Sequence, residues 1–144
     1  YWRVAGAVGA GDGPKRFHVP LSRDAVAWAA QHLTPLPRPW VAVGVGARWV
    51  TKRWPPGHYA ELLRRQQSHF GGTAVFVGGG EDSPLSQATA AGLRGPALDL
   101  TGRTSLPQLA AVLAACDVIL SNDTGPLHLA AALGRPCVAP YTCT

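Results

Sequence analysis

The sequence predicts an α/β fold in which a parallel sheet carries helices on both faces. From residue 40 onward, short apolar runs alternate with longer segments of helical periodicity. A glycine or a polar cluster follows the apolar runs. Strand–helix alternation at this spacing is typical of βαβ units, whose crossovers are right-handed. The pattern therefore predicts a doubly wound, Rossmann-like sheet in residues 40–144.

The individual elements follow from periodicity and from helix start and stop signals. Strands are predicted at residues 41–45, 73–77, 97–100, 118–120 and 137–139. Helices are predicted at residues 55–70, 84–93, 105–115 and 126–133, with Thr104 or Ser105 capping the third. The inward positions expected on the first and third helices are Tyr59, Leu62, Leu63 and Phe70, then Leu106, Leu109, Ala110 and Leu113.

Residues 1–39 are rich in glycine and proline and contain one predicted helix, at residues 22–33. Ser22 is the expected cap, and the expected apolar stripe is Val26, Ala29, Ala30 and Leu33. Residues 34–39 contain three prolines, which predicts a stiff extended linker. We therefore expect residues 1–39 to form a connector or docking arm rather than a second domain.

Composition limits the class of protein. The 144 residues fit one domain. The absence of Met, and an end inside an apolar run at residues 140–144, lead us to expect a piece of a longer polypeptide. The net charge of +5 comes from dispersed basic residues without interleaved aromatics, which argues against nucleic acid as a partner. An anionic small ligand, or anionic lipid headgroups nearby, explains the charge more economically.

Cysteine usage and hydropathy indicate a soluble protein of a reducing compartment. Cys116, Cys137 and Cys143 give an odd count with no CxxC pair, which argues against both a disulfide framework and a metal site. No signal peptide is recognisable, and no apolar run approaches the roughly 20 residues that cross a bilayer. We expect a cytoplasmic location.

The chemistry-bearing residues follow the predicted strands. In doubly wound sheets, ligands bind beyond the carboxyl ends of the strands. Arg48 and Lys52 follow the first strand, Glu81 follows the second, and residues 101–104 and 122–125 follow the third and fourth. All of these residues are therefore expected on one rim of the sheet.

Two of these loops allow a functional and a structural interpretation. Lys52 stands before a helix start, where a phosphate role competes with that of a solvated surface lysine. The glycines at residues 78–80 follow the second strand and not the first, so they do not fit a dinucleotide fingerprint. Glu81 is a candidate to bind a ribose or a base, with helix capping as the alternative, and capping is the favoured role of Asp82.

Residues 121–136 form the most informative segment. An apolar run stops at a polar elbow, and Pro126 fits the first helical position because its missing N–H has no partner there anyway. Asp123 or Thr124 is the expected cap, and His128 lies one turn further along the same face. A cap with an incidental histidine is the structural alternative. A zinc site lacks further ligands, and no Gly-x-Ser-x-Gly nucleophile elbow is present.

Four segments in register resemble glycosyltransferase family 9, the ADP-heptose:lipopolysaccharide heptosyltransferases. They are residues 52–55, 79–82, 99–106 and 122–136, and the resemblance covers about residues 40–142. It implies the C-terminal half of a GT-B enzyme, with the active site between two Rossmann-like domains.

The resemblance also implies roles for single residues. Lys52 would hold the donor pyrophosphate, Glu81 would contact the nucleoside, and Asp123, Thr124, Gly125 and His128 would surround the phosphate and heptose. Some members carry hydroxyl residues at positions 47 and 48, where Arg48 would substitute by charge. The implied reaction inverts the anomeric centre without a metal or other cofactor, and its general base would lie on the N-terminal domain.

The main hypothesis is therefore the ADP-heptose-binding domain of a heptosyltransferase acting on the lipopolysaccharide core, at the inner face of the inner membrane. The fragment alone would be inactive, and its open sheet edge would favour self-association. The acceptor, and any peripheral membrane contact, would belong to the parent protein. The alternatives are a nicotinamide-dinucleotide oxidoreductase domain and a non-catalytic sugar-nucleotide binding module.

Overall fold

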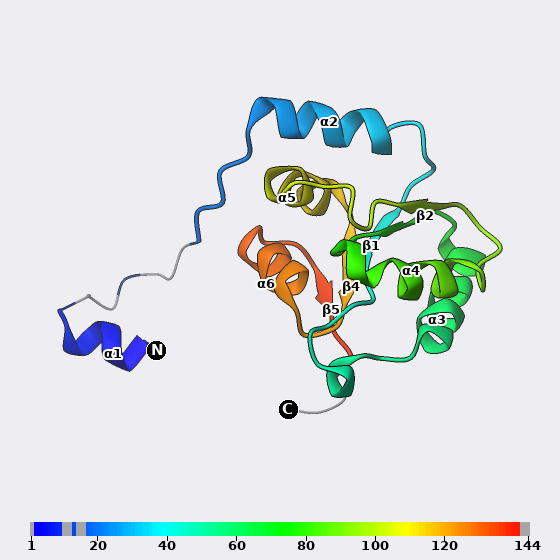
Figure 1. Ribbon diagram of the computed structural model, residues 1–144. Coiled ribbons are helices and arrows are strands. Elements are labelled where there is room, and N and C mark those ends of the chain that lie inside the picture. The colour runs from blue at the N-terminus through cyan, green and yellow to red at the C-terminus, as the bar shows by residue number, and fades with distance from the viewer. Residues whose placement is uncertain (1, 10–12, 14–16, 142–144) are drawn as a thin grey trace.

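The computed structural model describes residues 2–9, 13 and 17–141. A sheet of short parallel strands stands between two layers of helices (Figure 1). The strands are β1 (Trp40–Gly44), β2 (Thr73–Phe76), β3 (Ala97–Asp99), β4 (Val118–Ser121) and β5 (Cys137–Val138). The helices are α1 (Trp2–Ala7), α2 (Arg23–Leu33), α3 (Pro56–Phe70), α4 (Ser83–Ala90), α5 (Leu106–Ala115) and α6 (Gly125–Ala132), with 3₁₀ turns η1 (Val50–Lys52) and η2 (Gly80–Asp82).

The sheet has the order β3-β2-β1-β4-β5, and all four pairings are parallel. The chain winds outward from β1 to β3, then crosses back to β4 beside β1 and continues to β5. This strand order is that of a doubly wound sheet. The predicted α/β class, and each predicted strand within it, are confirmed.

Side chains of alternate strand residues enter two separate cores, as the two-residue period of a strand requires. On one face Ala42, Val75 and Ile119 pack with α2, α5 and α6. On the other face Val43, Phe76 and Leu120 pack with α3 and the α4 region. Because both faces are covered, the central strands β1, β2 and β4 carry apolar side chains at their middle positions.

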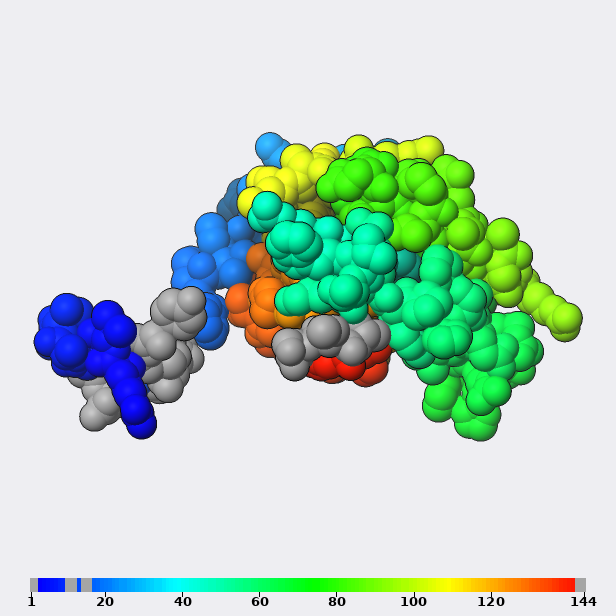
Figure 2. Space-filling view, turned by 60° about the horizontal axis from the view of Figure 1, so that its bottom comes forward, coloured from blue at the N-terminus to red at the C-terminus, as the bar shows by residue number. Residues whose placement is uncertain are grey.

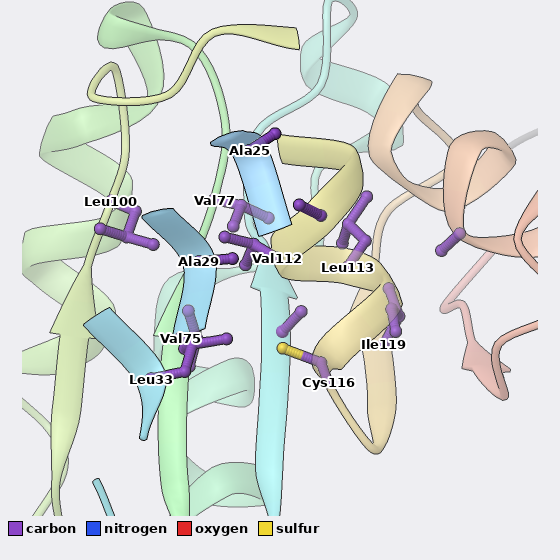
Figure 3. Packing of buried hydrophobic residues seen from close by; sticks show 13 residues of the cluster. Ala25, Ala29, Leu33, Val75, Val77, Leu100, Val112, Leu113, Cys116 and Ile119 are labelled. Carbon is purple, nitrogen blue, oxygen red and sulfur yellow. The ribbon is translucent and has the colours of Figure 1, made fainter. Parts of the chain in front are cut away.

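Helix α2 belongs to the packed body of the molecule. Its buried residues are Ala25, Ala29 and Leu33, which point at the sheet and at α5 (Figure 3). Ala29 and Leu33 of the predicted stripe are buried as expected, whereas Val26 and Ala30 are exposed and Ala25 is buried instead. Two apolar stripes run side by side on this helix, and the small side chains of Ala25 and Ala29 permit the closer approach. Ser22 caps the helix as expected. The domain division at residue 40 stays a prediction.

Three other expected core positions are exposed. Burial on α3 stops at Leu63, and Leu62 and Phe70 are 38% and 68% exposed. A 15-residue helix spans about 22 Å, whereas a four-residue strand spans about 13 Å, so the end of α3 that carries Phe70 has no strand beneath it. Leu62 is adjacent to the buried Leu63 but lies on the side of the helix that faces solvent. Leu106 is 71% exposed because it opens the first turn of α5, at the rim of the sheet. Ser105, not Thr104, caps that helix.

Three short elements were not predicted from the sequence: α1, η1 and η2. Helix α1 stands apart from the packed body in both whole-molecule views (Figures 1 and 2). The 3₁₀ turns are each three residues long, too short for a periodic signal. Both lie at the rim of the sheet where the strand-end loops meet.

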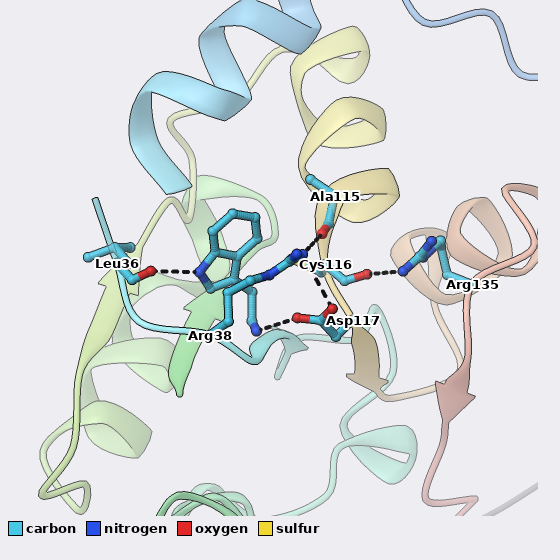
Figure 4. A network of polar contacts seen from close by, with 7 residues as sticks. Leu36, Arg38, Ala115, Cys116, Asp117 and Arg135 are labelled. Carbon is cyan, nitrogen blue, oxygen red and sulfur yellow. Dashed lines mark hydrogen bonds and ion pairs between the residues drawn. The ribbon is translucent and has the colours of Figure 1, made fainter. Parts of the chain in front are cut away.

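A polar cluster joins the amino ends of β1 and β4 (Figure 4). The Arg38 guanidinium lies over the Trp40 ring, donates to the carbonyl of Ala115 (3.0 Å) and pairs with Asp117 (3.3 Å). The Asp117 carboxylate also accepts from the Trp40 N–H (2.8 Å). Arg135 donates to the neighbouring carbonyl of Cys116 (2.6 Å). These contacts fix the chain that enters β1 to the start of β4.

The corrected α2 stripe predicts how two substitutions on one helix differ. Leu33→Ala removes a fully buried side chain and is expected to lower the free energy of unfolding by about 2–5 kcal/mol. Val26→Ala, in the stripe expected from sequence, should change it by less than about 0.5 kcal/mol. Urea unfolding followed by circular dichroism measures both. Equal losses would contradict the packing of α2 described above.

Candidate functional site

The candidate site lies where the winding of the sheet reverses. Strands β1 and β4 are neighbours, but α3 leaves β1 toward one face and α6 leaves β4 toward the other. Such a switch point leaves a crevice at the carboxyl ends of the strands. A cleft of about 950 Å³ opens there, lined by the loops after β1, β2 and β4 and the start of α5. Figure 2 looks toward this side of the molecule, with the β1–α3 segment at its centre.

Lys52 and Asp123 meet in this cleft. Lys52 ends η1 after β1, and Asp123 follows β4, so the switch point brings together residues 71 positions apart. The Lys52 Nζ donates to the Asp123 carboxylate at 2.6 Å, and the two side chains are partly exposed, at 34% and 22%. This hydrogen bond, above all, holds the pKa of the Asp123 carboxyl below its ordinary value.

His128 reaches the same carboxylate from outside the cleft. Its Nε2 lies 3.2 Å from Asp123 Oδ1, while its side chain is 71% exposed. One helical turn separates it from the first residue of α6, as the sequence predicts. His128 is not among the residues that line the cleft. The structure thus places His128 as a partner of Asp123, and its contact with a ligand stays a prediction.

The start of α6 differs from the expected cap. Thr124 occupies the N-cap position, but neither its side chain nor that of Asp123 makes the capping hydrogen bond. The Asp123 carboxylate is instead directed to Lys52 and His128, and the Thr124 hydroxyl lies 3.4 Å from Ser121 Oγ. The first turn of α6 therefore has no side-chain cap. Because Pro126 carries no N–H and the Leu127 N–H donates to the carbonyl of Thr124 (3.1 Å), this turn offers an anion the Gly125 N–H and the positive end of the helix dipole.

Gly125 opens that turn and lines the cleft. A Cβ at this position would have open space around it. The glycine is therefore not required by packing inside the chain, and its effect is to leave room beside the helix start. At the other end of α6, Gly134 has φ +70 and terminates the helix as predicted.

The remaining candidates line the same cleft from the loops after β1 and β2. Arg48 is exposed, with its guanidinium 5.5 Å from the Trp49 ring. Glu81 is exposed on η2. Asp82 accepts from the Gly79 N–H (3.1 Å), which matches its expected capping role, and burial raises the pKa of its carboxyl.

The charges of the cleft are separated by loop. Its lining includes three basic side chains, all from the β1–α3 segment, and three acidic ones. The basic residues are Arg48, Lys52 and Arg53, and the acidic residues are Glu81, Asp82 and Asp123. The overall charge of +5 is therefore not concentrated in the cleft. A positive side next to an acidic side suits a ligand that has an anionic part and a hydroxyl-bearing part.

Sequence reasoning missed the most connected residue of the site, Asn122. Its side chain is fully buried and makes four hydrogen bonds, with Trp54, Tyr59, Val45 and Gly46. A polar residue between an apolar strand and a conspicuous Asp-Thr-Gly gives no separate signal. Trp54 packs just before the start of α3, against Tyr59.

Other expectations concern metals, thiols and membranes. Within residues 2–9, 13 and 17–141, no three His, Cys, Asp or Glu side chains form a group able to hold a metal ion. Cys116 is buried, Cys137 is exposed, and both are free, while Cys143 lies outside the described residues. Burial raises the pKa of the Cys116 thiol to about 12. None of the described helices is long and apolar enough to span a bilayer.

The strand order, the helices on both faces and the cleft at the switch point define a Rossmann-like α/β domain. Comparisons with known proteins identify the family. Residues 10–144 match the sequence model of glycosyltransferase family 9 (heptosyltransferase). The chain belongs to this family. The match begins 30 residues before position 40, where the resemblance seen in the sequence starts.

Individual relatives agree with this assignment. Lipopolysaccharide heptosyltransferase 2 of Salmonella typhimurium is 38% identical over 109 residues, covering 72% of this chain and 31% of that protein. The solved structure of the E. coli ADP-heptose lps heptosyltransferase II superimposes with a TM-score of 0.74 at 34% identity, covering 92% of this chain and 42% of that one. A family 9 glycosyltransferase from Veillonella parvula gives a TM-score of 0.86 at 25% identity, with 95% and 41% coverage. The chain thus spans about a third of the length of the curated relatives it matches.

The Lys52–Asp123 pair predicts a pH dependence of stability. Because the pKa of Asp123 is lowered in the folded chain, the pair stabilises the fold above the ordinary aspartate pKa of about 4. That contribution is lost as the pH falls through the lowered value. Lys52→Met should return the Asp123 pKa toward its ordinary value, as followed by carbon-detected NMR of the carboxyl.

Arg48→Met is the matched control, because it removes a cleft charge without touching Asp123. It should leave the Asp123 titration almost unchanged. An Asp123 pKa that is the same with and without the Lys52 ammonium would refute the assigned cause.

Proposed function

We propose that this chain forms the donor-binding half of an inverting heptosyltransferase, which transfers a heptose from ADP-heptose to the inner core of lipopolysaccharide. The proposal places the chain in the C-terminal half of a two-domain GT-B enzyme. The observation that carries it is the cleft at the switch point, where Lys52 and Asp123 meet beside the uncapped start of α6. Family membership supplies the substrate class.

The arrangement of charge supports one orientation of the donor. The diphosphate would lie against Lys52 and the Gly125 N–H that begins α6, where an ammonium and a helix terminus both favour anions. Arg48 stands on the same loop and would add charge at the outer edge. The nucleoside would extend toward the β2 loop, where the Glu81 carboxylate is available to accept hydrogen bonds from ribose hydroxyls.

Asp123 and His128 would act on the sugar-phosphate side without carrying the proton of the reaction. Asp123 holds the Lys52 ammonium in place, and His128 contacts the other oxygen of the same carboxylate. In this proposal Thr124 and Gly125 leave the backbone of the helix start accessible. No metal is required, because the ammonium and the helix start supply the positive charge near the leaving diphosphate.

The rest of the reaction is assigned to the parent protein. The general base and the acceptor site would lie on the other domain of the GT-B pair. Because the acceptor of this reaction is a lipid-linked glycan, we place the parent in the cytoplasm at the inner face of the inner membrane. The relatives' greater length is consistent with this division.

A calorimetric titration of the chain with ADP, ADP-heptose, UDP-glucose and NAD tests the donor assignment. We expect binding of ADP and ADP-heptose and weaker or no binding of the other two. Lys52→Met should weaken ADP binding by about 10- to 150-fold, because a charge-assisted hydrogen bond contributes about 1.5–3 kcal/mol. Arg94→Met removes the same charge far from the cleft and should leave the affinity unchanged.

Several outcomes would decide against the proposal. A preference for NAD would favour the oxidoreductase alternative. Absence of ADP binding at millimolar concentration would exclude a donor site in this cleft. Equal losses in Lys52→Met and Arg94→Met would show that ADP responds only to overall charge.

The proposed location of the general base makes a separate prediction. We expect no heptose transfer when the purified chain is mixed with ADP-heptose and a lipopolysaccharide acceptor that lacks heptose. The absence of a base on this chain is the reason, since donor binding alone does not activate the acceptor hydroxyl. Mass spectrometry of the acceptor measures transfer. Turnover by these 144 residues would show that the base lies on this chain.

A further inference from the structure

The buried residue Asn122 directly precedes Asp123 and forms hydrogen bonds with both ends of the loop that carries Lys52. It stands at the end of β4. Its backbone N–H donates to the carbonyl of Gly44 (3.1 Å), which continues the β1–β4 ladder beyond the strands. Asp123 therefore emerges from a point fixed by the sheet.

Both the nitrogen and the oxygen of the Asn122 carboxamide form hydrogen bonds. Its Nδ2 donates to the carbonyls of Val45 (2.8 Å) and Gly46 (3.3 Å), in the loop that leaves β1. Its Oδ1 accepts from the Trp54 N–H (3.0 Å) and from the Tyr59 hydroxyl (2.8 Å). An amide is suited to this place because it combines donors and an acceptor without charge.

These contacts hold both ends of the segment that carries Lys52. Residues 45 and 46 begin the segment and residue 54 ends it, with η1 between them. Arg53 adds an internal brace, because its Nε donates to the carbonyl of Ala47 (2.8 Å). The described ends of this loop are thus tied to the residue next to Asp123, on the other side of the switch point.

We propose that Asn122 is a positioning residue for the phosphate site, whose buried carboxamide sets the position of the Lys52 loop relative to Asp123. The Lys52–Asp123 hydrogen bond is short, so a loop shift of about 1 Å takes it out of hydrogen-bond range. The proposed role in donor binding rests on the proposed function, whereas the positioning of Lys52 does not.

Tyr59 provides the matched control. Its hydroxyl shares Asn122 Oδ1, and its side chain is fully buried, so Tyr59→Phe disturbs the same buried network. The phenylalanine variant keeps the Trp54 hydrogen bond and both donations from Asn122. Asn122→Ser shortens the side chain and removes the ties to the Lys52 loop. A merely structural role predicts the same consequences for the two variants.

The test measures the site with and without a ligand, in the full chain and under conditions where each variant is folded. Without ligand, NMR titration should show the Asp123 pKa rising toward its ordinary value in Asn122→Ser and remaining low in Tyr59→Phe. With inorganic pyrophosphate as probe, calorimetry should show a loss of about tenfold or more in Asn122→Ser and less than about twofold in Tyr59→Phe. Both variants should lose stability in urea.

The outcomes separate the two proposals. An unchanged Asp123 titration and pyrophosphate affinity in Asn122→Ser would overturn the positioning role, as would equal changes in Tyr59→Phe. If the parent chain binds neither ADP nor pyrophosphate but Asn122→Ser still shifts Asp123, the donor site fails and the positioning role stands. Should Asn122→Ser not fold, Asn122→Thr fills more of the same volume without adding charge while losing the donating amide, and the same contrast with Tyr59→Phe in the Asp123 pKa and in pyrophosphate affinity is expected.

Discussion

The pairing of β1 with β4 is the constraint on which the rest of this structure depends. The pairing places Gly44 beside Ser121, where a Cβ on residue 44 would come within 2.4 Å of the serine hydroxyl. Glycine therefore permits the last step of the ladder. Because the helices that follow these two strands leave toward opposite faces, their loops meet with open space between them. Lys52 and Asp123 are close only because of this reversal.

Inside that geometry, buried polar contacts are distributed in a regular way. Most of the sheet interior is apolar, and polar side chains enter it where strands end. Asn122 is such a residue at the carboxyl end of β4. Thr101, which follows β3, is another, and its hydroxyl lies 2.8 Å from that of Ser86 on α4. A buried polar group without a partner costs stability, so each of these side chains fixes the loops that satisfy it. Hydrogen bonds to buried side chains of the core therefore set the positions of the cleft loops.

The sequence was sufficient for the strands, the main helices and the rim, because these depend on local periodicity and on one rule about parallel sheets. It was insufficient wherever the burial or the hydrogen bonds of a side chain depended on a residue distant in the sequence. On α2, the sequence placed Ala29 and Leu33 correctly but could not choose between Ala25 and Val26, since both are apolar and adjacent in the first turn. Asp123 fits a helix cap by sequence, but Lys52 offers it a stronger, charged partner. Asn122 gave no signal, because its partners lie far from it along the chain.

The β1–β4 pair is held at both ends, by Arg38 and Asp117 where the strands begin and by Asn122 where they finish. Because contacts hold both ends of the pair, β1 resists sliding along β4. Helix α2 is packed against the same body, so a force applied to the preceding chain is delivered to the sheet as a whole. The loops of the cleft, which Asn122 ties to this strand pair, would move together with the sheet under such a force.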